Sequence, residues 1–330
     1  MSIVSVPDRA STYAPPPAAP RDESPIVVER WPTERPLFAL SVAVSLVAWL
    51  LIVVSVIGLV YALAFGTFFF IMQLAFVAHV RGSAVKLGAE QFPALHHRVA
   101  SLARRMGLQQ VPDAYLMQAG GTLNAFATRF LRSHIIVLHS DLLDACGDDE
   151  AARDMIIAHE LGHVHAGHLR WRWLTIPAGI VPFLGGALSR AREYTCDRYG
   201  LAGAGNVNGA LTGLAILAAG ASHGPRVNRV AMVRQRRDLD TAWMALGEWL
   251  GTHPPLAKRM AALDPALAAE AGRSTAGPLR AAAIIGLLFA VTIGGAITAA
   301  RDIGRIMKQV ERDATNRAQV QAPPASPFTP

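Results

Sequence analysis

The chain has 330 residues, a hydrophobic fraction of 52% and a formal net charge of +7. Two cysteines are too few for the disulfide framework of a small secreted protein, so we expect Cys146 and Cys196 to be reduced thiols. The densest basic cluster, Arg234, Arg236 and Arg237, has no interleaved aromatic residues and matches no nucleic-acid-binding module. We therefore predict no nucleic acid partner and interpret the cluster as a solvated face near lipid headgroups.

The first 80 residues fall into two parts. Residues 1–35 contain three consecutive prolines and few large apolar groups, which predicts a disordered N-terminal tail. Residues 36–80 contain no Asp, Glu, Lys or Arg, and as one helix these 45 residues would reach about 67 Å, against a hydrocarbon core of about 30 Å. We predict a hairpin of two membrane spans with a tight turn within residues 58–66. The alternative is one long tilted helix that runs out of the membrane.

Residues 81–277 are patterned like a folded domain, mainly α-helical with a small β-sheet (α+β). Apolar residues at three- and four-residue steps predict an amphipathic helix over about 92–106. Short strands are predicted over 114–118, 123–129 and 134–139. A further helix is expected over about 149–168, since acidic residues at its start favour the positive end of the helix dipole.

The C-terminal part contains a second charge-free block. Residues 281–300 match one membrane span in length, and residues 301–330 are expected to form an amphipathic extension followed by a disordered tail. An uncharged stretch of 15 residues, Leu174 to Leu188, is shorter and is interrupted by Pro177 and Pro182. We expect that stretch to be buried or interfacial and not to span the membrane.

The helix over 149–168 carries His159, Glu160 and His163. Two histidines four residues apart lie about 40° apart around a helix, so both imidazoles can bind one metal ion. Glu160 is placed to take a proton from the attacking water instead of binding the metal. The alternative is a helix that carries His and Glu by chance. The apolar turn before His159 favours a buried site, because buried imidazoles without partners would be unfavourable.

A catalytic zinc ion needs a third protein ligand and an open position. His165 and His168 would lie about 200° and 140° around a continuing helix, so we expect both to point away and to be exposed or to lie behind the ligands. The better third ligand is Glu193. Asp197 follows it by four residues on the same helix face and could accept the second N–H of a zinc-binding His.

Two readings of that second helix remain open on spacing alone. An ordinary charged helix with local Arg–Glu pairs would show the same pattern around Glu193. Cys196 has the chemistry of a metal ligand, but it lies three residues from Glu193 and we interpret it as a packing residue.

Four motifs together resemble the HtpX-like family of integral-membrane zinc metallopeptidases, metallopeptidase family forty-eight, which includes the CAAX prenyl proteases. They are Asn124-Ala125-Phe126-Ala127, His159 to His163, Glu193 to Asp197, and Thr252-His253-Pro254-Pro255-Leu256 with Arg259. Members of this family usually carry two membrane spans between the zinc-binding helix and the third ligand, where this chain has only residues 174–188.

The resemblance implies a gluzincin-type zinc peptidase domain with transmembrane helices. It implies that Glu193 is the third ligand, that Glu160 is the catalytic base, and that His253 lies near the site and stabilises the oxyanion. It also implies that peptide substrate pairs as an added strand along Asn124, Ala125 and Phe126.

The sequence therefore predicts a zinc-dependent endopeptidase with one Zn²⁺ per chain, acting on membrane or membrane-associated proteins in the lipid bilayer. The alternative is a zinc-stabilised membrane scaffold or adaptor without proteolytic activity. Cationic residues near the membrane are more numerous on the side of the catalytic region, eight against five, which favours a multi-pass protein of the inner membrane with that region in the cytoplasm. The eight are Arg21, Arg30, Arg35, Arg81, Lys86, Arg98, Arg273 and Arg280, and the five are Arg301, Arg305, Lys308, Arg312 and Arg317.

Overall fold

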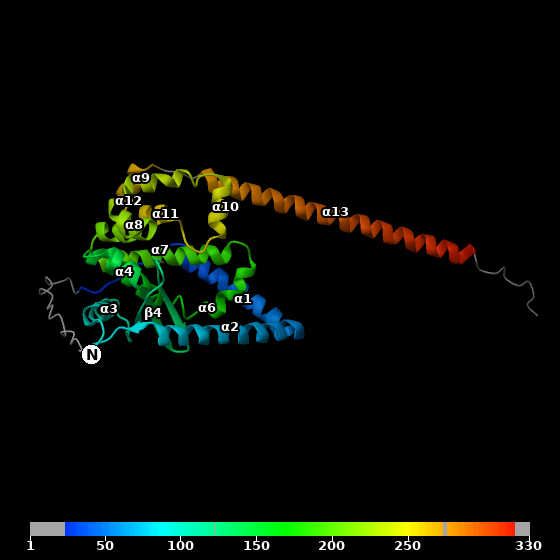
Figure 1. The fold of residues 1–330 in the computed structure, drawn as a ribbon. Helices are drawn as coiled ribbons and strands as arrows, with labels where there is room; N and C mark the ends of the chain where they lie inside the picture. Colours follow the sequence, from blue (N-terminus) through cyan, green and yellow to red (C-terminus); the bar gives the residue numbers. More distant parts are fainter. Residues whose placement is uncertain (1–23, 122, 273–275, 321–330) are drawn as a thin grey trace, which may run out of the picture. The chain divides into compact units, whose positions relative to one another are not determined.

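A computed structural model describes residues 24–121, 123–272 and 276–320 (Figure 1). The chain forms two compact units. One comprises residues 1–234 and 250–271, and the other comprises residues 235–249 and 272–330. Most of the predicted tail at 1–35, and residues 321–330, lie outside the described residues.

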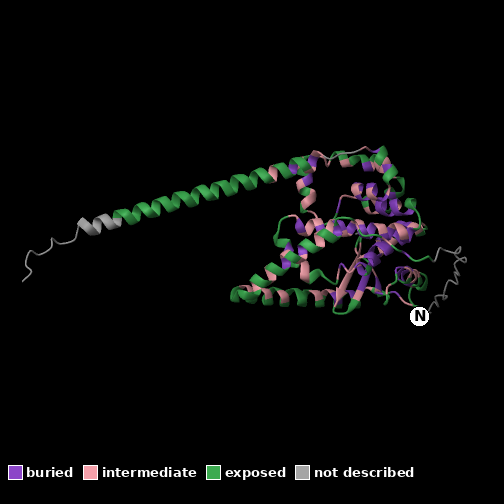
Figure 2. Ribbon diagram, turned by 180° about the vertical axis from the view of Figure 1, so that it is seen from behind, coloured by how far each residue is buried: buried purple, intermediate pink, exposed green. Residues whose placement is uncertain are grey.

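The first unit begins with two apolar helices, α1 (Glu34–Val54) and α2 (Val56–Ser83), and both are candidate membrane spans by length and composition. The structure has two helices where a pair of spans is predicted, and the turn between them lies at Ser55 and not within residues 58–66. Ser55 adopts an extended backbone, and its hydroxyl accepts the Gly58 N–H at 3.1 Å, which starts the second helix at once. The apolar side chains towards this turn are largely exposed (Figure 2).

A four-stranded mixed sheet follows α2. Its strands are β1 (Val85–Lys86), β2 (Asp113–Met117), β3 (Ala125–Phe130) and β4 (Ser133–His139), in the order β1-β2-β4-β3. Strands β2 and β4 run parallel, and the other two pairs are antiparallel. The predicted amphipathic helix is α3 (Pro93–Arg105), whose buried face includes Val99 and Leu102. Because β3 is the terminal strand, one of its edges is not paired within the sheet.

Two helices pack closely at the centre of the unit, α5 (Glu150–His165) and α7 (Leu184–Ala204). Small residues allow the approach. A Cβ atom at Gly203 would lie 2.2 Å from the Cβ of Ala158, and one at Gly162 would lie 3.1 Å from Tyr199. This contact brings the side chains of α7 onto the face of α5 that carries the histidines. The lack of a side chain at Gly203 therefore allows the two helices to approach this closely.

Further helices complete the core around this pair. They are α4 (Ser140–Cys146), α8 (Val207–His223), η2 (Gly224–Arg226), α9 (Arg229–Arg234), α11 (Leu256–Leu263) and α12 (Pro265–Glu270). Their apolar faces bury Met155, Leu211, Leu214 and Met260 in one hydrophobic cluster. Burial of each such side chain favours folding by roughly 1.5–3 kcal/mol, so the cluster supplies a rigid frame for the site.

The uncharged stretch at residues 174–188 includes the end of α6 (Arg172–Thr175), η1 (Ile176–Ile180) and the start of α7, and both α6 and η1 pack beside α1. The backbone N–H of Ala178 donates to Ser45 Oγ at 2.9 Å, and both residues are buried. Ile180 on the same segment is 74% exposed. The segment therefore combines a buried contact to a candidate span with exposed apolar side chains.

Residues 24–33 precede α1 and pack on the first unit, although the sequence predicts disorder there. The Ile26 N–H donates to the Arg105 carbonyl at 2.8 Å, and Trp31 stacks on Tyr194 with ring centroids 4.5 Å apart. For these residues the prediction of disorder is wrong. A few large side chains find specific partners far along the chain, which composition alone does not reveal.

The second unit contains η3 (Gln235–Arg237), α10 (Ala242–Leu250) and the long helix α13 (Ala276–Val320). The Asp240 carboxylate accepts the backbone N–H of Gly277 at 2.6 Å, which favours helix formation at that point. Residues Ala276–Asp313 of α13 are the third candidate membrane span. The helix thus includes the predicted span at 281–300 and continues into the predicted extension.

Candidate metal centre

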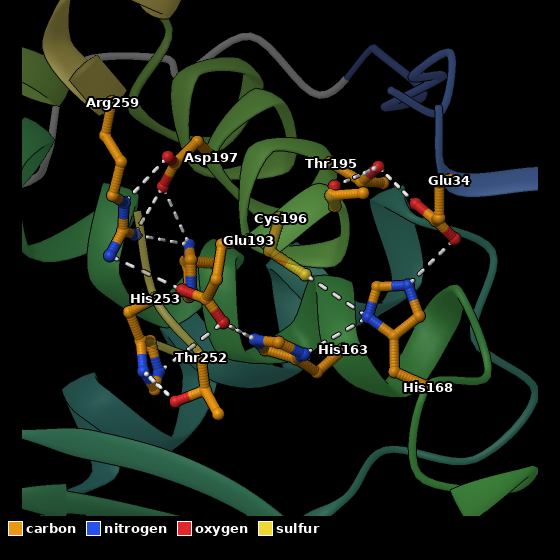
Figure 3. Close-up of polar contacts among 12 residues, drawn as sticks. Glu34, His163, His168, Glu193, Thr195, Cys196, Asp197, Thr252, His253 and Arg259 are labelled. Atoms are coloured by element: carbon orange, nitrogen blue, oxygen red, sulfur yellow. Dashed lines mark hydrogen bonds and ion pairs between the residues drawn. The ribbon is translucent and has the colours of Figure 1, made fainter. Parts of the chain in front are cut away.

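Three side chains from α5 and α7 meet at one point. His159 Nε2 lies 3.5 Å from Glu193 Oε2. His163 Nε2 lies 3.3 Å from Glu193 Oε1 (Figure 3). One ligand atom from each of the three residues falls within 4.8 Å of the others. The two imidazoles come from one face of α5, as their four-residue spacing predicts. The predicted ligand set His159, His163 and Glu193 is therefore assembled in space.

The electrostatics of this cluster favour a cation. Burial opposes ionisation of Glu193, but hydrogen bonds and charge from the two histidines outweigh it and hold the pKa of Glu193 well below its usual range. Burial likewise opposes protonation of His159, yet Asp197 and Glu193 raise the pKa of His159 to about 10. Without a metal ion, His159 therefore takes up a proton, because the adjacent carboxylates of Asp197 and Glu193 favour its charged form. Two imidazoles and one carboxylate are the donor types that Zn²⁺ takes in catalytic sites, so the residues fit this ion.

Asp197 lies behind His159, where the sequence predicts it. Its Oδ1 is 3.1 Å from His159 Nδ1, and its Oδ2 accepts a hydrogen bond from Arg259 Nε at 2.8 Å. Arg259 is buried, and its Nη1 also lies 3.4 Å from Glu193 Oε2. Burial disfavours ionisation of Asp197, but Arg259 and His159 outweigh it and lower the Asp197 pKa. Asp197 therefore stays an anion that accepts the Nδ1–H of His159, and this contact turns Nε2 towards the cluster.

The other predicted site residues line a cavity of about 440 Å³ at this cluster. Glu160 is buried on α5, and Asn124, Ala125 and Phe126 line another part of the wall. Here β3 begins, so the terminal strand of the sheet borders the cavity. His253 is 68% exposed and its Nε2 lies 3.7 Å from Glu193 Oε1, with Thr252 Oγ1 3.0 Å from its Nδ1 (Figure 3).

His168 does not point away from the cluster as predicted, and of the two expected positions, exposed or behind the ligands, it takes the second. Helix α5 ends at His165, Gly167 adopts φ 74°, and the His168 N–H donates to the His163 carbonyl at 3.1 Å. The chain therefore folds back, and His168 Nδ1 lies 3.1 Å from His163 Nδ1. The predicted direction of His168 assumes a helix that continues through Gly167, and the left-handed backbone at Gly167 rules this out. His165 is exposed, as expected, and its Nδ1 lies 2.8 Å from the Tyr199 hydroxyl.

Two further residues lie near the cluster: Glu34, which has no predicted role, and Cys196, whose predicted role is packing. Glu34, the first residue of α1, is 1% exposed and reaches His168 Nε2 at 3.1 Å. The sulfur of Cys196 is 3.6 Å from His168 Nδ1, and burial followed by nearby carboxylates raises the Cys196 thiol pKa, so the thiol stays protonated. His163, His168 and Cys196 form a second group whose ligand atoms lie within 4.8 Å of one another. No periodic pattern links residue 34 to residue 168, so sequence inspection missed this contact.

Comparisons with known proteins bear on the family. The sequence profile of peptidase family M48 matches residues 89–177 and 172–267, which together span more than half of the 330 residues. A comparison with curated proteins finds no match. The chain is similar to the crystal structure of S. mikatae Ste24p, with 14% identity and a TM-score of 0.37, over 71% of this chain and 63% of that chain. The matched segments contain both candidate histidine ligands, Glu193 and His253, and on the profile match the chain belongs to peptidase family M48.

Proposed function

We propose that the chain is a membrane-bound, zinc-dependent endopeptidase that holds one zinc ion with His159, His163 and Glu193. The observation that carries this proposal is the convergence of two imidazoles and one carboxylate within 4.8 Å, at a cavity that also contains Glu160. Membership of a peptidase family and three candidate membrane spans support it. The substrates proposed are peptide segments of membrane or membrane-associated proteins.

Bound at this cluster, zinc would supply a Lewis acid that polarises the scissile carbonyl and lowers the pKa of water to about 7. Glu160 takes the proton of the attacking water and passes it to the leaving amine. His253, at the exposed side of the cluster, donates to the oxyanion that develops on the substrate carbonyl. The outer edge of β3 pairs with the peptide as an added strand and presents the scissile bond to the cavity.

The test combines metal content with turnover on the full-length protein in detergent. We expect about one zinc per chain by elemental analysis and casein cleavage that is lost on chelation. Glu160→Gln should keep its zinc and its fold, because the amide is nearly isosteric, and should lose about 10²–10⁴-fold in turnover. Glu150→Gln, an exposed change on the same helix, is the matched control and should keep wild-type turnover.

Two outcomes would contradict the proposal. Near-normal turnover of zinc-loaded Glu160→Gln would show that Glu160 is not the general base. Full zinc occupancy in His163→Ala would show that the ligand set is wrong. A wild-type protein with bound zinc but no turnover on any peptide would favour the alternative of a zinc-stabilised scaffold or adaptor.

We further propose a multi-pass protein of the inner membrane with the first unit's catalytic region in the cytoplasm. The support is the excess of cationic residues on that side of the predicted spans. Both native cysteines are buried, so an added thiol can be labelled alone. Gln91→Cys, at an exposed position beside α3, should resist a membrane-impermeant maleimide in spheroplasts and react after lysis. Labelling in intact spheroplasts would show that the catalytic region lies on the other side of the membrane.

A further inference from the structure

A buried path of side chains leads from His163 to the start of the first candidate membrane span. His163 Nδ1 and His168 Nδ1 are 3.1 Å apart, and His168 Nε2 lies 3.1 Å from Glu34 Oε1 (Figure 3). His168 is 5% exposed and Glu34 is 1% exposed. Water is thus largely excluded from this path, so the groups along it must satisfy one another.

Glu34 is held as an anion with its acceptor positions occupied. Arg30 Nη1 donates to its Oε1 at 2.8 Å, and the hydroxyl of Thr195 donates to its Oε2. Thr195 in turn accepts the N–H of Trp31 at 2.8 Å, so its hydroxyl proton is directed to Glu34. An ionised carboxylate only accepts hydrogen bonds. The proton between Glu34 and His168 therefore sits on His168 Nε2.

The tautomers of both histidines follow from that proton. A neutral imidazole carries one N–H, so His168 with a proton on Nε2 has a lone pair on Nδ1. The contact between the two Nδ1 atoms then needs its proton on His163. His163 protonated on Nδ1 has its lone pair on Nε2, the atom that faces Glu193 at 3.3 Å. This is the form in which an imidazole binds a metal ion.

We propose that His168 and Glu34 are positioning residues for the metal site, which fix the tautomer and orientation of His163. The proposal rests on the proposed function, since it takes His163 as a ligand. It adds that residue 34, outside the region matched by the family profile, supports the metal centre. The first candidate membrane span and the metal centre would then be linked by one hydrogen-bonded path.

The same atoms could serve a different purpose, as ligands of a second cation bound by His163, His168 and Cys196. The arrangement of protons argues against it. In the proposed path one proton lies between His163 Nδ1 and His168 Nδ1, which are 3.1 Å apart, and a cation held by both atoms would displace it. The experiment below includes this outcome.

The test measures metal affinity and ligand geometry, not turnover. Full-length protein in detergent is titrated with zinc against a competing chelator, and the Co²⁺-substituted protein gives a visible spectrum that reports the ligand field. His168→Phe keeps the ring and removes the acceptor, so zinc affinity should fall about 10–100-fold with a shifted Co²⁺ spectrum. His168→Asn can place an amide oxygen near the position of Nδ1 and should recover much of the affinity.

The matched control is His165→Phe. This exposed neighbour contacts Tyr199 and not the cluster, so its substitution should leave affinity and spectrum unchanged. Wild-type affinity and spectrum in His168→Phe would overturn the inference, provided that His159→Ala has lost its zinc. Retention of zinc in His159→Ala would instead overturn the proposed function. A second bound zinc that disappears in Cys196→Ser would show that His168 is a ligand and would also overturn the inference.

Discussion

The two candidate histidine ligands are supported in different ways. His159 contacts the carboxylate of Asp197, which Arg259 holds from behind with bonds of 2.8 and 2.5 Å. His163 instead contacts a second imidazole, His168, and the carboxylate of Glu34 lies one ring further away. Both arrangements place a hydrogen-bond acceptor at Nδ1 of the ligand. They differ in charge, because the first acceptor is an anion and the second is neutral.

The two supports also differ in their origin along the chain. Asp197 and Arg259 lie on α7 and α11, inside the region that matches peptidase family M48. Glu34 belongs to α1, a candidate membrane span before that region. One ligand is thus oriented from within the peptidase region, and the other depends on how the first span packs. The difference predicts that a change in the packing of α1 would affect the support of His163 more than that of His159.

The largest effect should come from Asp197→Asn. The substitution removes the anion at His159 and leaves the buried guanidinium of Arg259 without its main counter-charge. Breaking a buried ion pair in this way typically destabilises a protein by about 3–5 kcal/mol. We also expect zinc affinity to fall by about 100-fold, the upper end for loss of a group that orients a ligand. Thermal unfolding and zinc competition check the two effects separately.

Asp154→Asn is the matched control for that experiment. Asp154 is a buried aspartate on α5 that pairs with Arg98, away from the metal cluster. It should lose stability by a similar mechanism and keep zinc affinity. Equal loss of affinity in both variants would mean that general destabilisation, and not the orientation of His159, explains the effect of Asp197→Asn.

Glu34→Gln should have a smaller effect. The substitution removes the negative charge that keeps the proton on His168 Nε2. The amide oxygen of the new side chain can still accept a hydrogen bond from the His168 Nε2–H. The change acts on His163 only through His168, so we expect zinc affinity to fall by about 10-fold, the lower end for such groups. A loss as large as that of Asp197→Asn would abolish the proposed difference between the two supports.

Much of the metal centre could be predicted from the sequence because it depends on helical spacing. His159 and His163 share a face of α5, and Glu193 and Asp197 share a face of α7, as four-residue intervals require. The amphipathic pattern of α3 and the charge-free blocks of the candidate spans were equally local signals. Each of these features can be read within a single helix or a single charge-free block.

The residues that were missed depend on chain reversals and on contacts between distant segments. Gly167 ends the helical geometry, so the angle predicted for His168 no longer applied. Glu34 meets His168 across 134 residues, and Trp31 meets Tyr194 in a segment whose composition predicts disorder. The turn lies at Ser55, before the predicted range of residues 58–66, whose two ends are glycines, because a capping serine starts the second helix.

The smallest effect should come from Thr195→Val, which tests the far end of the His168–Glu34 support. Valine has nearly the shape of threonine, so packing at this fully buried position is kept. The hydroxyl joins the Trp31 N–H to Glu34, and its loss leaves both without this partner, a change of about 1–3 kcal/mol in the free energy of unfolding.

Arg30 and His168 still hold Glu34 Oε1, so zinc affinity should fall only several-fold, less than the roughly 10-fold expected for Glu34→Gln. Thr175→Val is the control, because the hydroxyl of this half-buried residue donates to backbone carbonyls of its own turn. If zinc affinity fell further in Thr195→Val than in Glu34→Gln, the effect would not decline with distance from His163. The hydroxyl would then act through the position of α7 and its ligand Glu193, and the path through Glu34 would have to be abandoned as the explanation.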